Sequence, residues 1–237
     1  MAIDICIVEQ NWDAPAGLLG EWAAARGHRV VTLRAPEIGA GPWPDPGRFG
    51  AIVPLGAEQS VHASPDPWIA PQVAWLREAH ARDVPVLGVC WGGQALAAAL
   101  GGEVFAADRP EIGWLDVKAL DGGTVASGPW FAWHSDVFTP PPGATVLARS
   151  DRCPHAFRLG RSIGLQFHPE VTPAIVDGWV RGGRDTLAAN AIDAEALRVR
   201  TAAEPDSDRR RSFALFDALA ADWTDGRRTT VQSGGQD

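Results

Sequence analysis

VLGVCWGGQ, residues 86–94, is the most informative stretch of the chain. It ends an apolar run, Val84–Val89, as expected for a strand buried on both faces of a parallel sheet. The run leads directly into Cys90, then Trp91 and two glycines, then a predicted helix over Gln94–Leu100. A sharp strand-to-helix turn with small residues around it is typical of a nucleophile elbow. The pattern predicts that Cys90 stands above the sheet edge, where a helix N-terminus favours its thiolate. The alternative is that Cys90 is a small buried apolar residue.

Upstream of this stretch, short apolar strands alternate with helices, which predicts a parallel sheet with crossover helices. The expected strands are Ile3–Val8, His28–Leu33 and Ala51–Leu55, and the expected helices are Pro15–Arg26 and Trp68–Arg82. The intervening segment Ala35–Gly47 is rich in proline and glycine and is expected to be loop.

Downstream of about Glu103 the pattern changes to shorter strands, with turn signals at Asp121-Gly122-Gly123 and at Pro140–Gly143. Ile163–Phe167 then returns to the pattern of a buried strand. Thr172-Pro173 predicts a helix start, with threonine as the N-cap and proline at the first helical position.

The last part of the chain is expected to be helical, over Ala194–Ala203 and Arg209–Trp223. The second of these helices has one apolar face, made by Phe213, Phe216, Ala220 and Trp223. The expected fold is therefore an open, mostly parallel α/β sheet with flanking helices, a smaller antiparallel region and a helical C-terminal extension. The expected division is a domain over residues 1–190, an extension over 191–225 packed on it, and a disordered tail over 226–237.

Composition excludes several classes of function. The net charge is −8 and the isoelectric point is about 5.2, so binding to a nucleic-acid backbone has no electrostatic support. No run approaches the roughly 18 apolar residues that span a bilayer. The N-terminal residues lack the basic region and cleavage site of a signal peptide, so we expect a cytoplasmic protein without a membrane partner.

Cysteine and lysine usage excludes further classes of site. Cys6, Cys90 and Cys153 are too few for a disulfide scaffold, and no Cys-x-x-Cys or clustered Cys/His spacing predicts a metal site. Lys118 is the only lysine, so the chain has no P-loop lysine for a nucleotide phosphate. We expect neither a metal nor a cofactor.

A cysteine nucleophile needs a histidine base and a group that orients it. His168 follows the predicted strand Ile163–Phe167 and lies in Gln-Phe-His-Pro-Glu, residues 166–170. Pro169 favours an extended backbone, in which side chains two residues apart face the same way. Glu170 is therefore expected to reach Nδ1 of His168, while Nε2 faces the Cys90 sulfur. The alternative is a surface histidine and glutamate at the end of a strand.

The segments around Cys90 and His168 resemble the two motifs of class I glutamine amidotransferases. The resemblance covers roughly residues 3–171, and the helical C-terminal part is similar to that of free-standing members related to the amidotransferase part of GMP synthase. It implies hydrolysis of glutamine through a γ-glutamyl thioester, without a cofactor. Cys90 would be the nucleophile, His168 the acid and base, and Glu170 its orienting group.

The resemblance also implies the groups that stabilise the oxyanion, which are backbone N–H groups in this family. Trp91 follows the nucleophile, and Gly56 lies in the turn after the third strand. The family more often has Gly-Gly-Pro or Gly-Gly-Met there, whereas this chain has Leu-Gly-Ala at residues 55–57. The alternative for Gly56 is an ordinary turn glycine.

Three residues are expected to contact the substrate. The segment Trp133-His134-Ser135-Asp136 resembles the His-x-Asp part of the family's glutamine pocket, so His134 and Asp136 would bind the amino-acid head group. Gln94 would do so from the elbow helix. The His-x-Asp motif is short, so a purely structural role is the alternative. Some of the eleven tryptophans are also expected to line a pocket, although most would pack in the core.

Three functions stay open. The first is a free-standing hydrolase of a γ-glutamyl amide that releases glutamate and an amine or ammonia. The second is a glutaminase subunit that supplies ammonia to a separate synthase. The third is a non-catalytic binding scaffold, which the presence of all three triad residues disfavours. We prefer the first, because the site is complete and the sequence contains no region that resembles a synthase.

Overall fold

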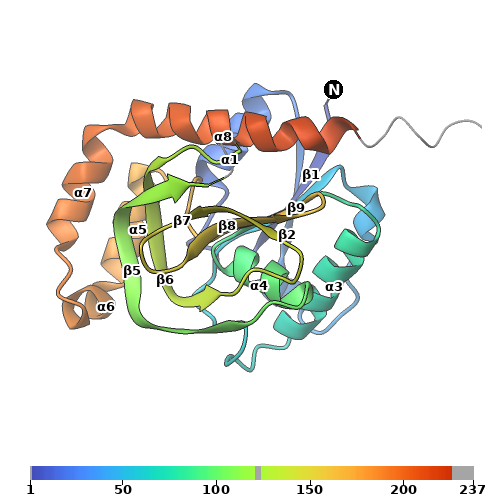
Figure 1. Cartoon of the computed structure of the whole chain (residues 1–237), viewed down its shortest axis with the longest axis horizontal. Helices are drawn as coiled ribbons and strands as arrows, with labels where there is room; N and C mark the ends of the chain where they lie inside the picture. Colours follow the sequence, from blue (N-terminus) through green and yellow to red (C-terminus); the bar gives the residue numbers. More distant parts are fainter. Residues whose placement is uncertain (1, 121–123, 226–237) are drawn as a thin grey trace, which may run out of the picture.

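The computed structural model describes residues 2–120 and 124–225 of the chain. In these residues nine strands form one sheet in the order β2-β1-β3-β4-β9-β8-β7-β5-β6 (Figure 1). The strands from β2 to β9 in this order pair in parallel, and those from β9 to β6 pair antiparallel. Their bounds are β1 Asp4–Glu9, β2 Arg29–Arg34, β3 Ala51–Pro54, β4 Val86–Val89, β5 Val104–Ala119, β6 Gly128–Phe138, β7 Thr145–Arg149, β8 Pro154–Leu159 and β9 Ser162–Leu165. The predicted α/β fold is confirmed.

Helices cover both faces of the parallel half of this sheet. On one face α1 (Gly17–Ala25) and α8 (Pro205–Asp225) pack over the strands, and on the other face lie α3 (Ile69–Ala81) and α4 (Trp91–Ala99). Strand β1 supplies both cores because successive side chains of a strand point to opposite faces. Ile5 and Ile7 are buried in the first core, and Cys6 and Val8 in the second.

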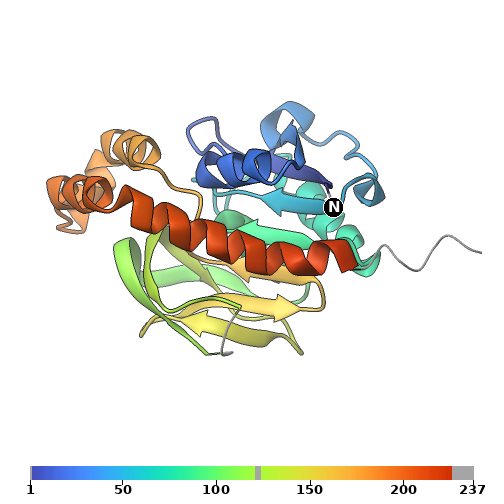
Figure 2. The same ribbon diagram turned by 90° about the horizontal axis from the view of Figure 1, so that it is seen from above.

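The C-terminal part is helical, with α5 (Pro173–Gly182), α6 (Arg184–Ala189) and α7 (Ala194–Ala203) before α8. Figure 2 shows α8 running across the molecule between α1 and the antiparallel strands. Its predicted apolar face is buried, with Phe216 and Trp223 packed against Trp22 of α1. The Trp22 indole and the Arg26 guanidinium both donate hydrogen bonds to Asp217, at 2.9 and 2.8 Å, and so bind α1 to α8.

Some sequence-based boundaries are wrong. The segment Ala35–Gly47, expected to be loop, contains α2 (Ala35–Ile38) and the start of a 3₁₀ turn (Pro46–Arg48). Both elements have proline in their first turn, where the missing N–H costs nothing.

The turn signal at residues 121–123 and the tail at 226–237 lie outside the described residues. No helix in the described part is long and apolar enough to cross a membrane.

Strands β5 and β6 form a long hairpin at the antiparallel end of the sheet (Figure 1). Their register shifts between Ala106 and Glu111, which indicates a β-bulge, and Glu111 then lies opposite His134. This hairpin carries the segment Trp133–Asp136 over the end of β4: the Trp133 carbonyl lies near the Cys90 sulfur, and the Asp136 carbonyl accepts from Gln94 of α4.

Candidate active site

Cys90 occupies a strained turn between β4 and α4. Its backbone has φ 51° and ψ −108°, a conformation that costs energy for any residue other than glycine. The turn is held by a hydrogen bond from Cys90 N–H to the Leu165 carbonyl at 2.8 Å. The helix begins at Trp91, three residues earlier than its predicted start at Gln94. Cys90 therefore lies directly at the N-terminus of the helix, with its side chain nearly buried.

Two glycines leave the space that this turn needs. A Cβ atom on Gly92 would lie 2.0 Å from the Pro54 carbonyl oxygen, and one on Gly88 would lie 2.3 Å from the Gly92 oxygen. Real Cβ atoms do not come this close to backbone oxygens, so a side chain at either position would push β3, β4 and α4 apart. This close approach explains why residues 86–94 carry glycine on both sides of the cysteine.

His168 and Glu170 form a buried pair beside Cys90. Nδ1 of His168 lies 2.7 Å from Oε1 of Glu170, and each side chain is only 3% exposed. The expected extended backbone is wrong at this point, because Pro169 and Glu170 form a turn. The pairing is nevertheless made, because His168 N–H donates to the Phe131 carbonyl at 2.7 Å and the Glu170 carbonyl accepts from Leu18 N–H at 2.8 Å.

The electrostatic environment favours a charged imidazole. Burial of the ring disfavours its cation, but the Glu170 carboxylate and the Cys90 sulfur outweigh this effect and raise the pKa of His168 to about 10. Nε2 of His168 is buried and has no hydrogen-bond partner among the described residues. The indole ring of Trp179 contacts the imidazole at 4.8 Å between centroids. This ring is itself fixed by a hydrogen bond to the Asp13 carbonyl at 2.9 Å.

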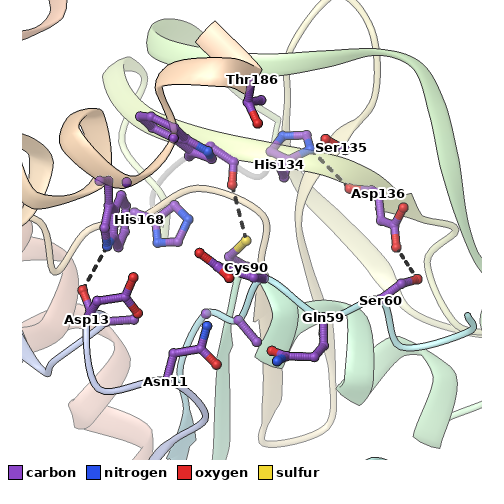
Figure 3. Close-up of a pocket in the computed structure, with 18 of the residues that line it drawn as sticks. Asn11, Asp13, Gln59, Ser60, Cys90, His134, Ser135, Asp136, His168 and Thr186 are labelled. Atoms are coloured by element: carbon purple, nitrogen blue, oxygen red, sulfur yellow. Dashed lines mark hydrogen bonds between the residues drawn. The ribbon is translucent and has the colours of Figure 1, made fainter. Parts of the chain in front are cut away.

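Cys90 and His168 face a common cavity of about 460 Å³ (Figure 3). This volume lies in the range of small-molecule sites. The cavity wall comes from six parts of the chain: the loops after β1 and β3, the β4–α4 elbow, strand β6, the segment after β9, and helices α5 and α6. Its lining includes Asn11, Asp13, Gly56, Gln59, Ser60, Trp133, Ser135, Trp179 and Thr186.

The two expected oxyanion donors lie on either side of Cys90. Gly56 lines the cavity, and a Cβ atom there would lie 3.0 Å from Cε1 of His168 and 3.8 Å from Cβ of Cys90. Trp91 is fully buried, and its ring packs on Trp68 at 5.0 Å between centroids. Trp91 is not among the described residues that line the cavity; its backbone is the first position of α4, directly after Cys90, and its role as an oxyanion donor stays a prediction.

The three expected substrate-binding residues all line the cavity, but each already forms a hydrogen bond with another group of the protein. The Gln94 amide donates to the Asp136 carbonyl at 2.8 Å, and Nδ1 of His134 lies 3.0 Å from the same oxygen. The Asp136 carboxylate accepts from the Ser60 hydroxyl at 2.5 Å. Substrate contact by these residues stays a prediction.

Sequence reasoning missed other residues that line the cavity. Asn11 and Asp13 follow β1, and ligands of open α/β sheets bind at the carboxyl ends of the strands, so this rule would have found them. Trp179 and Thr186 come from helices α5 and α6, where nothing in the local sequence indicates that they turn toward Cys90.

An open α/β sheet with a strained cysteine between strand and helix, beside a buried histidine–glutamate pair, defines the cysteine-nucleophile amidohydrolases. The family model "Glutamine amidotransferase class-I" matches residues 61–177. These residues form a domain of the class I glutamine amidotransferase family.

Curated relatives include GMP synthases described as glutamine-hydrolysing. That of Stenotrophomonas maltophilia is 37% identical over 140 residues, which cover 49% of this chain and 27% of the relative. That of Xanthomonas campestris pv. campestris is 35% identical over 177 residues, which cover 64% of this chain and 33% of the relative. The matched part of the chain thus spans a third or less of the length of these relatives.

Solved structures match over nearly the whole chain. A glutamine amidotransferase from Methylobacillus flagellatus has a TM-score of 0.81 and 26% identity, covering 93% of this chain and 95% of that one. A glutamine amidotransferase from Thermotoga maritima has a TM-score of 0.84 and 23% identity, covering 92% and 98%. The second likeness supports the fold alone.

Proposed function

We propose that this chain hydrolyses a γ-glutamyl amide through a thioester on Cys90 and releases glutamate and an amine or ammonia. One observation carries the proposal: the 2.7 Å pair of His168 and Glu170 lies beside a cysteine in a strained elbow, at one cavity. A buried ion pair next to a nucleophile is what general acid–base catalysis of acyl transfer requires.

The proposed reaction has two halves. The Cys90 thiolate attacks the amide carbonyl carbon, and the N–H groups of Gly56 and Trp91 stabilise the oxyanion. Nε2 of His168 gives its proton to the departing nitrogen, so the C–N bond breaks and the thioester remains. The neutral imidazole then takes a proton from water, whose oxygen attacks the thioester, and Cys90 leaves as the thiolate. Glu170 keeps the proton on Nδ1 and stabilises the cation.

The cavity supports the free-standing hydrolase over a glutaminase. Its lining includes the two indole rings of Trp133 and Trp179, which contact each other edge to face, so an amine larger than ammonia has an apolar wall to contact. The glutamate head group would bind at the opposite end, near Gln94, His134 and Asp136. We also propose that residues 1–190 form the amidotransferase-like domain and that residues 191–225 form a helical extension packed on it.

A glutaminase subunit is the second candidate. The curated relatives support it, because they are GMP synthases whose matched part is a third or less of their length. In that case the amide is that of glutamine, and the ammonia goes to a separate synthase. A non-catalytic scaffold has the least support, because the three proposed catalytic side chains lie together at one cavity.

The test is glutamate release by the purified chain, offered glutamine and a panel of γ-glutamyl amides in parallel. Faster turnover of a substituted amide than of glutamine supports the hydrolase. If no substrate is turned over but a glutamine-like electrophile still labels Cys90, the result supports a glutaminase subunit that works with a separate synthase. Cys90→Ala is expected to abolish turnover, whereas Cys6→Ala, a change of another buried cysteine, is the matched control. Activity that survives in Cys90→Ala would overturn the mechanism.

A further inference from the structure

Behind the active-site cavity, four buried side chains with metal-ligating atoms converge. They are Glu111 on β5, His134 on β6, Cys153 just before β8 and His155 on β8, and one ligand atom of each lies within 4.8 Å of all the others. None of the four residues is more than 7% exposed. Only His134 also lines the active-site cavity, and its two ring nitrogens face the Asp136 carbonyl and Glu111 rather than the substrate, so the cluster needs its own explanation.

The distances from one Glu111 oxygen to the other three ligand atoms are close to those of a tetrahedral zinc site. Oε2 of Glu111 lies 3.0 Å from Sγ of Cys153, 3.1 Å from Nε2 of His155 and 3.4 Å from Nε2 of His134. Zinc bonds of about 2.0 Å to oxygen and nitrogen and about 2.3 Å to sulfur put neighbouring ligand atoms about 3.3–3.5 Å apart in a tetrahedron. The other three pairs of ligand atoms lie within 4.8 Å of one another, so all four atoms surround one small space.

Hydrogen bonds orient two of the four ligands, His134 and Glu111, in a way that suits a metal site, whereas Nδ1 of His155 has no hydrogen-bond partner among the described residues. Nδ1 of His134 lies 3.0 Å from the Asp136 carbonyl, which can only accept, so the proton is on Nδ1. Nε2 of the same ring then directs a lone pair at the cluster, and it is buried without a hydrogen-bond partner among the described residues. The Ser150 hydroxyl donates to the other oxygen of Glu111 at 2.9 Å.

A purely hydrogen-bonded cluster explains these observations less well. The Cys153 thiol and the His155 ring can each donate to Glu111, which would satisfy its carboxylate. The Nε2 lone pair of His134 would still face a carboxylate oxygen at 3.4 Å, with nothing positive between the two. A buried polar atom in this position is costly, and a cation removes the cost.

We propose that Glu111, His134, Cys153 and His155 bind one Zn²⁺ ion in a closed, four-ligand site. On binding, Cys153 releases its thiol proton to solvent, so that one thiolate and one carboxylate balance the two positive charges of the ion. Carboxylate, imidazole and thiolate are the ligands that zinc takes in proteins. Four protein ligands leave no open position for water, so the site is structural.

The position of the site indicates what the ion does. Glu111 and His134 are opposite each other in the β5–β6 hairpin, whereas His155 lies on β8 and Cys153 just before it, and β8 is separated from β5 in the sheet by β7 (Figure 1). The ion would thus tie the hairpin to the body of the sheet. The residue before His134 is Trp133, whose carbonyl lies 3.8 Å from the Cys90 sulfur. Zinc would therefore fix the wall of the cavity next to the nucleophile.

The test uses the full chain with Cys90→Ala, because this change removes the Cys90 and His168 pair as a competing zinc site. The protein is stripped with a chelator and reloaded with Zn²⁺ or with Co²⁺, whose visible bands and thiolate charge-transfer band report a four-coordinate site. We expect one zinc per chain by elemental analysis, a higher Tm with Zn²⁺, and a cobalt–thiolate band.

Variants in the same background identify the ligands. Cys153→Ala should abolish the cobalt–thiolate band, whereas Cys6→Ala, which removes a buried thiol from β1, should leave it unchanged. Ser150→Ala, which removes the hydrogen bond to Glu111, should weaken zinc binding by about 10–100-fold.

The proposal is overturned if the reloaded Cys90→Ala protein holds less than about one zinc per ten chains and its Tm does not respond to zinc. It is also overturned if the cobalt band persists in Cys153→Ala. The metal content of the Cys90→Ala protein needs no change in the cluster itself, so it decides the question even if the Cys153 variant fails to fold.

Discussion

Glu170→Gln is expected to lower kcat/KM for amide hydrolysis by about a thousandfold. The carboxylate lies 2.7 Å from Nδ1 of His168, and both side chains are 3% exposed, so little water screens the pair. With about 4 Å between the charge centres and an effective dielectric constant of about 20, the attraction is about 4 kcal/mol. Each loss of about 1.4 kcal/mol in the transition state lowers the rate tenfold. Glutamine keeps the side-chain length and can still accept from Nδ1, so the loss of charge is the main change.

The assay is glutamate release at pH 7 with the best substrate of the panel, together with the rate at which an alkylating reagent modifies Cys90. Both rates should fall, because a less basic His168 withdraws less of the Cys90 proton. Glu37→Gln, on an exposed glutamate that pairs with Arg34 at 3.3 Å, is the matched control. A kcat/KM within about threefold of wild type, in a variant with an unchanged circular dichroism spectrum, would refute the reasoning.

Three further outcomes are expected. The pKa of His168 is raised from 6.5 to about 10, so the stability it contributes is complete below about pH 6.5 and is lost as the pH rises through about 10. The Tm difference between wild type and Glu170→Gln should therefore shrink over this range, and a constant difference would speak against the ion pair. Gly92→Ala should destabilise the fold by about 1–3 kcal/mol in urea unfolding, because its Cβ would lie 2.0 Å from a carbonyl oxygen. Gly178→Ala, in the middle of α5 with open space around it, should stabilise by about 1 kcal/mol, and equal effects of the two would contradict the packing argument. Asp136→Asn should raise KM more than about tenfold with kcat nearly unchanged if this carboxylate binds the substrate, as steady-state kinetics would show.

The parts of the fold with strong local patterns were predictable from the sequence. The buried run before Cys90 indicated a central parallel strand, and the glycines after it indicated a turn without room for side chains. Thr172 is the N-cap of α5, and its hydroxyl accepts from Ile175 N–H at 3.3 Å, as the Thr-Pro pair predicts. These features depend on residues that are neighbours in the chain, so a single sequence contains the information.

The features that were missed depend on residues far apart in the chain. Glu111 and His155 are 44 positions apart, and only the bulge in β5 and the pairing of two hairpins bring them to 3.1 Å. No spacing rule for metal ligands covers residues from three strands. Trp179 likewise contacts His168 only because α5 folds back over the sheet edge. The turn at Pro169 was missed because the residue before a proline favours an extended backbone, whereas the tertiary contact of the Glu170 carbonyl with α1 decides the local shape.

The contact between α8, α1 and Glu170 has a consequence for how the protein matures during translation. The Glu170 carbonyl is held by α1, and α1 is in turn held by Asp217 of α8 through hydrogen bonds that join residues 195 and 191 positions apart. Domains fold from the N-terminus as the ribosome releases them, and contacts between such distant residues form late. A nascent chain that has already exposed Cys90, His168 and Glu170 therefore lacks the support that positions the glutamate. We expect activity to appear only after α8 leaves the ribosome, so that an incomplete chain cannot consume substrate.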